Sequence, residues 1–294
     1  MSIDRRRALV ALAAALPAAR LQTSSARAQA AAPPPALAVR PPALPQLSIP
    51  AEVAAKVGRQ VWINESGASV DGLTAWNAGE DFPSLGIGHW IWFKAGGHPI
   101  FEESFPKLIG FIRAQGVNPP AWLDKQQVPP CPWPNKAEFE RQFRGEQLTE
   151  LRRFLQATIP QQAQYLLRRT QDAIPKMLAS LTDPAERQHL LTQLNRVVRA
   201  SADLYPLIDY VNFKGEGISD KETVFDPPTG RNQGWGTKWL LLEMKGTAEG
   251  PPALAEFSRA SKAVLDRRIR NHPSSQRWRE GWHKRCDTYK RPLA

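Results

Sequence analysis

Asn64-Glu-Ser-Gly67, followed by Ser84-Leu-Gly-Ile-Gly-His-Trp-Ile-Trp-Phe93, is the stretch that decides the fold of this chain. Apolar residues before it recur at the spacing of one helix face, at Val53, Val57, Val61 and Trp62. Glycine commonly follows the last turn of a helix. The pattern therefore predicts a helix that starts near Ser48-Ile-Pro50 and ends at Gly67, with Glu65 at its C-terminal edge.

A β-hairpin is expected next. Two β-prone runs, Gly72–Asn77 and Ser84–Phe93, are joined by Ala78–Pro83, which is rich in turn residues. In a strand, alternate side chains point to opposite faces. One face of the second run would carry Ser84, Gly86, Gly88, Trp90 and Trp92, and the other would carry Leu85, Ile87, His89, Ile91 and Phe93.

The first of these faces has the character of a sugar-binding surface. It offers a hydroxyl, two glycines where a ligand can approach the backbone, and two indoles that can stack on a flat ring. The alternative is that the glycines relieve crowding and the tryptophans pack beneath helices. His89 is expected in the core, because it shares a face with Leu85, Ile87 and Ile91.

The rest of the chain is mostly helical. A proline-rich loop over 117–135 precedes apolar positions of helical spacing over 139–155, 161–179, 184–201, 237–245, 252–270 and 276–289. The expected fold class is mainly α with a small β-hairpin. We expect one domain over 49–294, with a helix-and-hairpin lobe over 49–116 and a helical lobe over 136–294.

The N-terminal residues have the organisation of an export signal. Arginines at positions 5 to 7 precede the apolar run Ala8–Leu16, and small residues end the segment at Ala28 and Ala30. Residues 1–30 are therefore predicted to be a signal peptide, and Arg5-Arg6 resembles a twin-arginine signal. Residues 31–48, rich in proline and alanine, are predicted to form an extended linker. The mature protein would be periplasmic or secreted.

Charge and cysteine content narrow the class of partner. Removal of residues 1–30 takes away five arginines and one aspartate, which lowers the formal net charge from +11 to +7. A basic surface favours anionic polymers, but no nucleic-acid-binding motif is present and no nucleic-acid partner is expected. The mature chain has no transmembrane segment by sequence. Cys131 and Cys286 are expected either to form one disulfide or to remain as two buried thiols. Neither cysteine lies in a motif that suggests a metal site, and no cofactor is expected.

Glu65 and the Ser84-Leu-Gly-Ile-Gly-His89 strand resemble the active-site segment of phage-type lysozymes. In that family a helix ends in the catalytic glutamate, and a hairpin closes with Thr-x-Gly-x-Gly-His, so Ser84 stands where threonine is usual. The resemblance covers Asn64 to His89 only. It implies a lysozyme-like fold and peptidoglycan, or another cell-wall glycan, as the partner. The same string also resembles a group of exported proteobacterial proteins of uncertain function, which supplies no mechanism.

Glycoside cleavage requires a carboxylic acid that protonates the leaving oxygen, and an apolar setting favours the protonated form. Glu65, beside Trp62 and Ile63, is the candidate. The family's aspartate in the hairpin turn is missing here, since Ala78 takes its place; Glu80 is the nominated second carboxylate, with Asp81 nearby. Without a second carboxylate, a single-acid mechanism of the lytic transglycosylase type is the alternative, in which Ser84 positions water or substrate.

A second group of polar and aromatic residues is expected to form the opposite wall of a cleft. It lies at Asp209–Gly217 and Gln233–Gly236, where Asn212, Gln233 and Trp235 would contact sugar and Glu216 could supply the missing carboxylate. Turn formation explains the glycines equally well. Ser104-Phe-Pro-Lys107 matches Ser-x-x-Lys, but its partner motif Lys-Thr-Gly is absent. The alternative function is a non-catalytic glycan-binding protein with a degenerate cleft, and a third is a structural or partner-binding protein.

Overall fold

The structure is a computed structural model, and it describes residues 44–97 and 102–293. The predicted signal peptide and most of the predicted linker lie outside these residues. Ala43–Ala294 forms one compact unit, which is mainly helical with two small antiparallel sheets. The α+β class expected from the sequence is thus confirmed. The unit starts earlier than residue 49, because Leu44 and Leu47 pack on the core and the Leu47 backbone N–H donates to Gln171 Oε1 at 2.8 Å.

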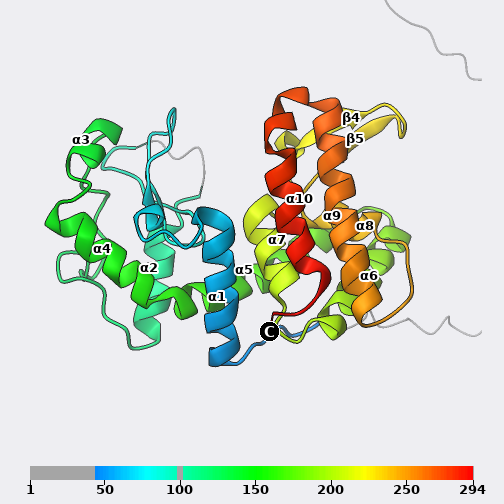
Figure 1. Cartoon of the computed structure of the whole chain (residues 1–294), viewed down its shortest axis with the longest axis horizontal. Helices are drawn as coiled ribbons and strands as arrows, with labels where there is room; N and C mark the ends of the chain where they lie inside the picture. Colours follow the sequence, from blue (N-terminus) through cyan, green and yellow to red (C-terminus); the bar gives the residue numbers. More distant parts are fainter. Residues whose placement is uncertain (1–43, 98–101, 294) are drawn as a thin grey trace, which may run out of the picture. The chain divides into compact units, whose positions relative to one another are not determined.

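Helices α1 and α5 form the framework on which the site is built. Helix α1 (Ala51–Ser66) follows Pro50 and ends at Gly67, whose φ of 63° is the left-handed conformation that favours glycine. It packs against α5 (Ile159–Ala179), as Figure 1 shows. At Gly58 an added Cβ would come within 2.7 Å of the Ile159 side chain, so glycine permits this close packing. The end of α1 is therefore held firmly, and Glu65 with it.

The predicted hairpin is instead a three-stranded antiparallel sheet of very short strands, β1 (Thr74–Ala75), β2 (Ser84–Leu85) and β3 (Trp90–Ile91). The prediction of one continuous strand over 84–93 was wrong. The chain reverses between Leu85 and Trp90, which face each other in the register. Gly86 and His89 both have positive φ, 63° and 49°, and this left-handed backbone turns the chain.

Further helices complete the unit. Before α5 lie α2 (Phe105–Ala114), α3 (Lys136–Arg141) and α4 (Glu146–Ala157). The single helix expected over 139–155 is broken before Gly145, which precedes α4, and α2 was not predicted. After α5 lie α6 (Pro184–Ala200), α7 (Tyr205–Lys214), α8 (Thr237–Glu243), α9 (Pro251–Asn271) and α10 (Arg279–Asp287). Short 3-10 helices cover Asp71–Leu73, Asp220–Glu222, Pro273–Trp278 and Thr288–Lys290.

A second hairpin, which the sequence did not predict, pairs β4 (Thr223–Asp226) with β5 (Arg231–Gly234). Both cysteines are buried free thiols. Burial raises the pKa of Cys131 to about 12 and that of Cys286 to about 11, so both stay protonated at neutral pH. Within residues 44–97 and 102–293, no helix is both long and apolar enough to cross a bilayer.

Candidate active site

Glu65 lies at the end of α1 with its carboxylate fixed by side chains from distant parts of the chain. Its Oε1 accepts hydrogen bonds from Arg285 Nη2 at 2.6 Å and from Asn212 Nδ2 at 3.1 Å. Its Oε2 lies 3.7 Å from His89 Nε2, and the side chain is 12% exposed. The carboxylate therefore bonds to side chains of α10 and α7, and not to the backbone of the following turn.

Arg285 also holds a second carboxylate, that of Asp209 on α7. The Arg285 Nε and Nη2 atoms donate to the two Asp209 oxygens, each at 2.8 Å. Asp209 accepts two further hydrogen bonds, one from Tyr289 Oη at 2.6 Å and one from Asn64 Nδ2 at 3.2 Å. The Asp209 side chain is fully buried. Burial by itself lowers the pKa of Arg285, but the Asp209 and Glu65 carboxylates outweigh it and raise that pKa well above its usual range.

These contacts differ from the apolar setting that the sequence predicted for Glu65. Two carboxylates share one guanidinium, so the cluster of Glu65, Arg285 and Asp209 carries one negative charge in excess when both acids are ionised. Of the two acids, Glu65 is the one that reaches solvent. Glu65 is therefore the acid of the pair that a ligand could contact.

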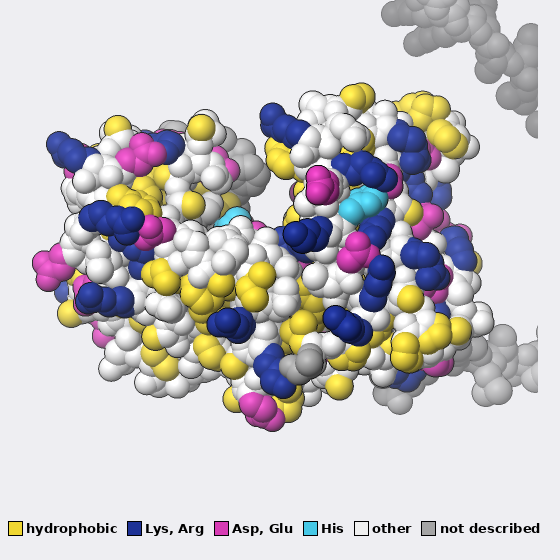
Figure 2. Space-filling model, viewed as in Figure 1, with side chains coloured by type: hydrophobic (Ala, Val, Ile, Leu, Met, Phe, Trp, Pro, Cys, Tyr) yellow, Lys and Arg dark blue, Asp and Glu magenta, His cyan; other side chains and the backbone are white. Residues whose placement is uncertain are grey.

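A groove of about 770 Å³ opens beside this cluster. Its walls come from the β2–β3 turn, α2, α5, α7 and the residues after α7, and they include His89 and Asn212, the two other neighbours of Glu65. Figure 2 shows a hollow in the surface between the part of the unit that contains α1 to α4 and the part that contains α7 and α10. Glu65 thus lies directly behind residues that face the groove.

Two of the predicted cleft residues, Asn212 and Glu216, do line this groove. Asn212 Nδ2 also approaches the carbonyl oxygen of Ile87 at 3.4 Å, which links α7 to the β2–β3 turn. The Glu216 carboxylate accepts a hydrogen bond from Lys176 Nζ of α5 at 2.9 Å. The structure therefore brings one amide and one further carboxylate from the 209–217 segment to the groove.

The prediction that Trp90 and Trp92 stack on a sugar ring was wrong. Both indoles are fully buried. Trp90 lies against Tyr165 and its Nε1 donates to Gln162 Oε1 at 3.2 Å, whereas Trp92 packs on Phe105 and its Nε1 donates to the Pro129 carbonyl at 2.9 Å. Because the chain reverses after Leu85, the alternation of one long strand does not apply.

The glycines of the turn are explained mainly by close packing. A Cβ at Gly86 would lie 2.2 Å from Gln162 Oε1, and one at Gly88 would lie 2.3 Å from the Trp90 ring. Gly86 is buried, and Gly88 lines the groove. The prediction of a core position for His89 was wrong, since its left-handed backbone turns the side chain outward and leaves it 47% exposed beside Glu65.

Ser84 and Glu80, the predicted assistants of Glu65, are not brought to it. Ser84 is buried within the sheet and does not line the groove. Glu80 is an exposed turn residue whose carboxylate accepts from Asn77 Nδ2 at 3.1 Å and whose carbonyl accepts from Trp76 Nε1 at 2.8 Å. Its neighbour Asp81 pairs with Lys94 at 2.7 Å.

Gln233 and Trp235 lie away from the groove. Gln233 is buried, donates to Thr229 Oγ1 at 3.2 Å and accepts from Arg267 at 3.3 Å beside a different pocket. Trp235 is half-buried with the Arg268 guanidinium 4.1 Å from its ring centroid. The prediction that these two residues contact the substrate is wrong for this groove, because both contact arginine side chains of α9.

Three important residues near Glu65 were missed as functional residues: Arg285, Asp209 and Lys214. The Nζ of Lys214 lies 3.9 Å from the Phe213 ring centroid and 3.8 Å from that of Trp282. Burial, with the nearby charges of Arg268 and Arg285, lowers the pKa of Lys214 to about 7. Asp209 and Lys214 lie in the Asp209–Gly217 segment, whose polar and aromatic residues the sequence analysis singled out. Arg285 lies in no such motif, and it is 220 residues from Glu65 in the sequence.

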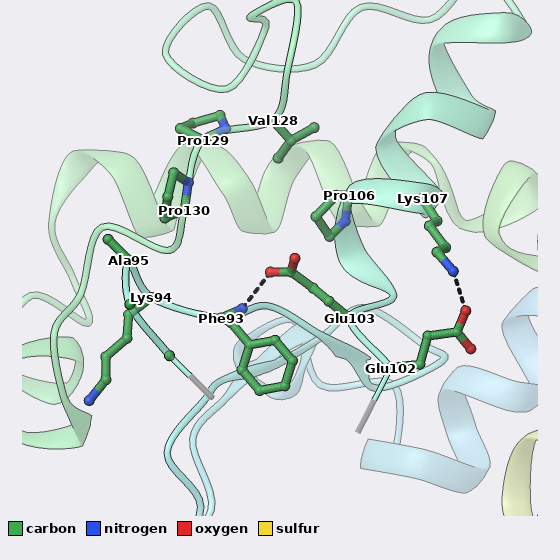
Figure 3. Close-up of a pocket in the computed structure, with 12 residues that line it drawn as sticks. Phe93, Lys94, Ala95, Glu102, Glu103, Pro106, Lys107, Val128, Pro129 and Pro130 are labelled. Atoms are coloured by element: carbon green, nitrogen blue, oxygen red, sulfur yellow. Dashed lines mark hydrogen bonds and ion pairs between the residues drawn. The ribbon is translucent and has the colours of Figure 1, made fainter. Parts of the chain in front are cut away.

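A separate hollow, drawn in Figure 3, lies beside Phe93, Glu103 and Pro129. There the Glu103 carboxylate accepts the Phe93 backbone N–H at 2.7 Å, and Lys107 pairs with Glu102. We assign this hollow no ligand. Within the described ranges, no group of three or more His, Cys, Asp or Glu side chains is arranged to hold a metal ion.

Comparison of the chain with protein-family models, with curated proteins and with solved structures finds no match.

Proposed function

We propose that this protein is an exported glycosidase of the lysozyme type, or a lytic transglycosylase, that cleaves peptidoglycan with Glu65 as the general acid. The observation that carries the proposal is the fixed position of the Glu65 carboxylate beside the groove, between Asn212 and His89. The predicted export signal supports peptidoglycan as the substrate, since an exported protein meets that polymer.

The charge of the cluster supports a proton-donating role. Arg285 is shared between Glu65 and Asp209. It donates two hydrogen bonds to Asp209 and one to Glu65, and Asp209 also accepts from Tyr289 and Asn64. Asp209 thus gives Arg285 a partner of opposite charge besides Glu65. In the proposed reaction Glu65 delivers a proton to the glycosidic oxygen, while Asn212 holds the carboxyl group in position.

Glu216 is the proposed second carboxylate, in place of Glu80. It lines the same groove as Asn212 and lies on the segment after α7. In a hydrolysis, Glu216 would take a proton from the water that attacks the anomeric carbon, while the glycosidic bond breaks and Glu65 protonates the leaving oxygen. If Glu216 takes no part, the 6-hydroxyl of the sugar attacks the anomeric carbon instead and gives its proton to the Glu65 carboxylate, so the product carries a 1,6-anhydro end.

One observation favours the alternative of a glycan-binding protein that does not cleave. A carboxylate hydrogen-bonded to a buried guanidinium is stabilised as the anion, and an anion cannot donate a proton. In this alternative, Glu65 and Asn212 would accept and donate hydrogen bonds to sugar hydroxyls, and the groove would hold the polymer intact.

The test is digestion of purified sacculi by the mature protein and by Glu65→Gln, with the soluble fragments identified by mass spectrometry. Glu52→Gln, at an exposed position in the first turn of the same helix, is the matched control. We expect fragments from the wild type and the control and a loss of about a hundredfold or more in Glu65→Gln. Reducing ends would indicate hydrolysis and anhydro ends transglycosylation.

Equal release by wild type and Glu65→Gln would refute Glu65 as the acid. Binding of sacculi by the wild type without any release would favour the non-catalytic alternative. Both variants should be checked for cooperative unfolding first, because Glu65 also contacts Arg285.

A further inference from the structure

The wall of the groove formed by α5 is strongly charged. Arg168, Asp172 and Lys176 follow one another at four-residue spacing, which places them on one face of the helix, and Arg169 lies beside them. All four line the groove. The same groove receives Lys107 and Glu102 from the segment that contains α2.

Some of these charges are already neutralised. Lys176 Nζ pairs with Glu216 at 2.9 Å, and Lys107 pairs with Glu102, as Figure 3 shows for the second pair. These two ion pairs leave the groove wall with two arginines and one aspartate.

Arg168 and Arg169 are the cations that lack a carboxylate partner. Among the described residues, neither guanidinium forms an ion pair or a side-chain hydrogen bond, and both side chains are exposed. The Arg169 guanidinium lies 5.3 Å from the centroid of the buried Trp90 ring, which restrains it on the groove side of α5. Asp172 likewise forms no ion pair with the residues that the structure describes, and it offsets only one of the two charges. The α5 wall therefore has an unmatched positive charge.

Such a pair of guanidinium groups suits a carboxylate better than a neutral hydroxyl. A guanidinium presents parallel N–H donors that match the two oxygens of a carboxylate. The hydrogen bonds are also stronger than those to a hydroxyl, because both groups are charged. A neutral polysaccharide would leave this wall without a partner, and an amine-bearing one would be repelled.

We propose that Arg168 and Arg169 make the groove selective for a glycan that carries carboxylates, and that they bind those carboxylates directly. The inference rests on the proposed function in taking the groove to be a glycan site, and it adds the charge class of the substrate. Peptide-bearing wall glycans belong to this class, whereas chitin-like polymers do not.

The experiment measures binding by calorimetry, so it does not depend on cleavage. The ligand is a purified disaccharide tetrapeptide released from sacculi, used with its carboxylates free and with the same carboxylates converted to amides. The proteins are the full mature chain, the double variant Arg168→Gln/Arg169→Gln and the matched control Arg59→Gln/Arg153→Gln. The control removes two exposed arginines of α1 and α4 that do not line the groove and that form no ion pair within residues 44–97 and 102–293.

We expect the wild type and the control to bind the free-carboxylate ligand at least about tenfold more tightly than its amide. The groove variant should bind both forms equally, at about the affinity of the amide. Higher salt should weaken the free form and leave the amide unaffected.

Three results would overturn the inference: equal affinity of the wild type for both ligands, equal losses in groove and control variants, or no binding of either ligand. Selective binding of the free form without release of fragments from sacculi would support the inference and refute the proposed cleavage. The two proposals can therefore fail separately.

Discussion

The two parts of the chain that the sequence nominated for the site, the β-hairpin and the segment around α7, have opposite structural roles. The hairpin turns most of its nominated side chains inward, and Trp90 and Trp92 are fully buried. The segment around α7 supplies polar groups to the groove or to the cluster behind it, through Asn212, Glu216 and Asp209. The hairpin thus lines the groove through the β2–β3 turn, while α7 and α10 supply the hydrogen-bond donors of Glu65.

The contrast is tested most severely at Arg285. Arg285→Met would leave the fully buried Asp209 and the nearly buried Glu65 without their cation. We expect a loss of about 3 to 5 kcal/mol in the free energy of unfolding, measured by urea denaturation. Arg279→Met on the same helix is the control, because Arg279 pairs with Asp266 near the surface and should cost less than about 1 kcal/mol. Similar losses in both variants would show that the buried cluster has no special role.

Gln162 tests the structural role of the hairpin. Its Oε1 accepts from Ile87 N at 3.0 Å and from Trp90 Nε1 at 3.2 Å, in a fully buried position. Gln162→Leu would leave both donors unsatisfied and should cost about 3 kcal/mol in thermal or chemical unfolding. The half-buried Gln164→Leu on the same helix should change the unfolding free energy by about 0.5 kcal/mol or less. A neutral effect of Gln162→Leu would contradict the view that the turn is held from inside.

Lys214, at the end of α7, should make the stability of the protein depend on pH. The pKa of Lys214 is about 7 in the folded chain because of burial, whereas in the unfolded chain it has its ordinary value of about 10.5. Between these values the unfolded chain binds more protons, so this lysine makes the free energy of unfolding rise with pH. From pH 7 to pH 9 we expect a contribution of about 2 kcal/mol that Lys214→Met removes.

The measurement is urea denaturation at several pH values, with Lys56→Met, an exposed position of α1, as the control that should keep the wild-type slope. An unchanged slope in Lys214→Met would show that the lysine titrates in the folded chain as it does in the unfolded one.

The smallest expected effect on stability is at Glu216. Its ion pair with Lys176 joins two side chains that retain solvent contact, so Glu216→Gln should change the free energy of unfolding by less than about 1 kcal/mol. If Glu216 activates water, the same variant should either release fragments with anhydro ends in place of reducing ends or release no fragments from sacculi. Lys176→Gln breaks the same ion pair and serves as the control for stability. Release unchanged in both amount and chemistry would exclude Glu216 from the reaction.

The sequence predicted the parts of the fold that depend on local patterns. The end of α1 at Gly67 and the long helices α5, α6 and α9 follow from helical spacing and from glycine and proline positions. The break before Gly145 and the β2–β3 turn were missed, since apolar residues continue across both. A left-handed backbone at His89, a residue with a Cβ, has no clear sequence signal.

The site was predicted in part, for a related reason. Glu65, Asn212 and Glu216 sit in recognisable helix-end segments, so they could be nominated individually. The contacts that Glu65 makes could not be predicted, because those with Asn212 and with Arg285 join residues 147 and 220 positions apart. No periodicity or motif reports on such pairs.

The contact between Glu65 and Arg285 also sets the order in which the molecule can mature. A contact of such long sequence separation forms only after the intervening chain has been made and its loops have closed. During synthesis, α1 and the hairpin leave the ribosome long before α10 does. In refolding experiments, helical circular dichroism should therefore recover before the groove gains its ligand affinity; simultaneous recovery would argue against this order. A chain arrested before α10 would lack Arg285, the cation that Glu65 and Asp209 share.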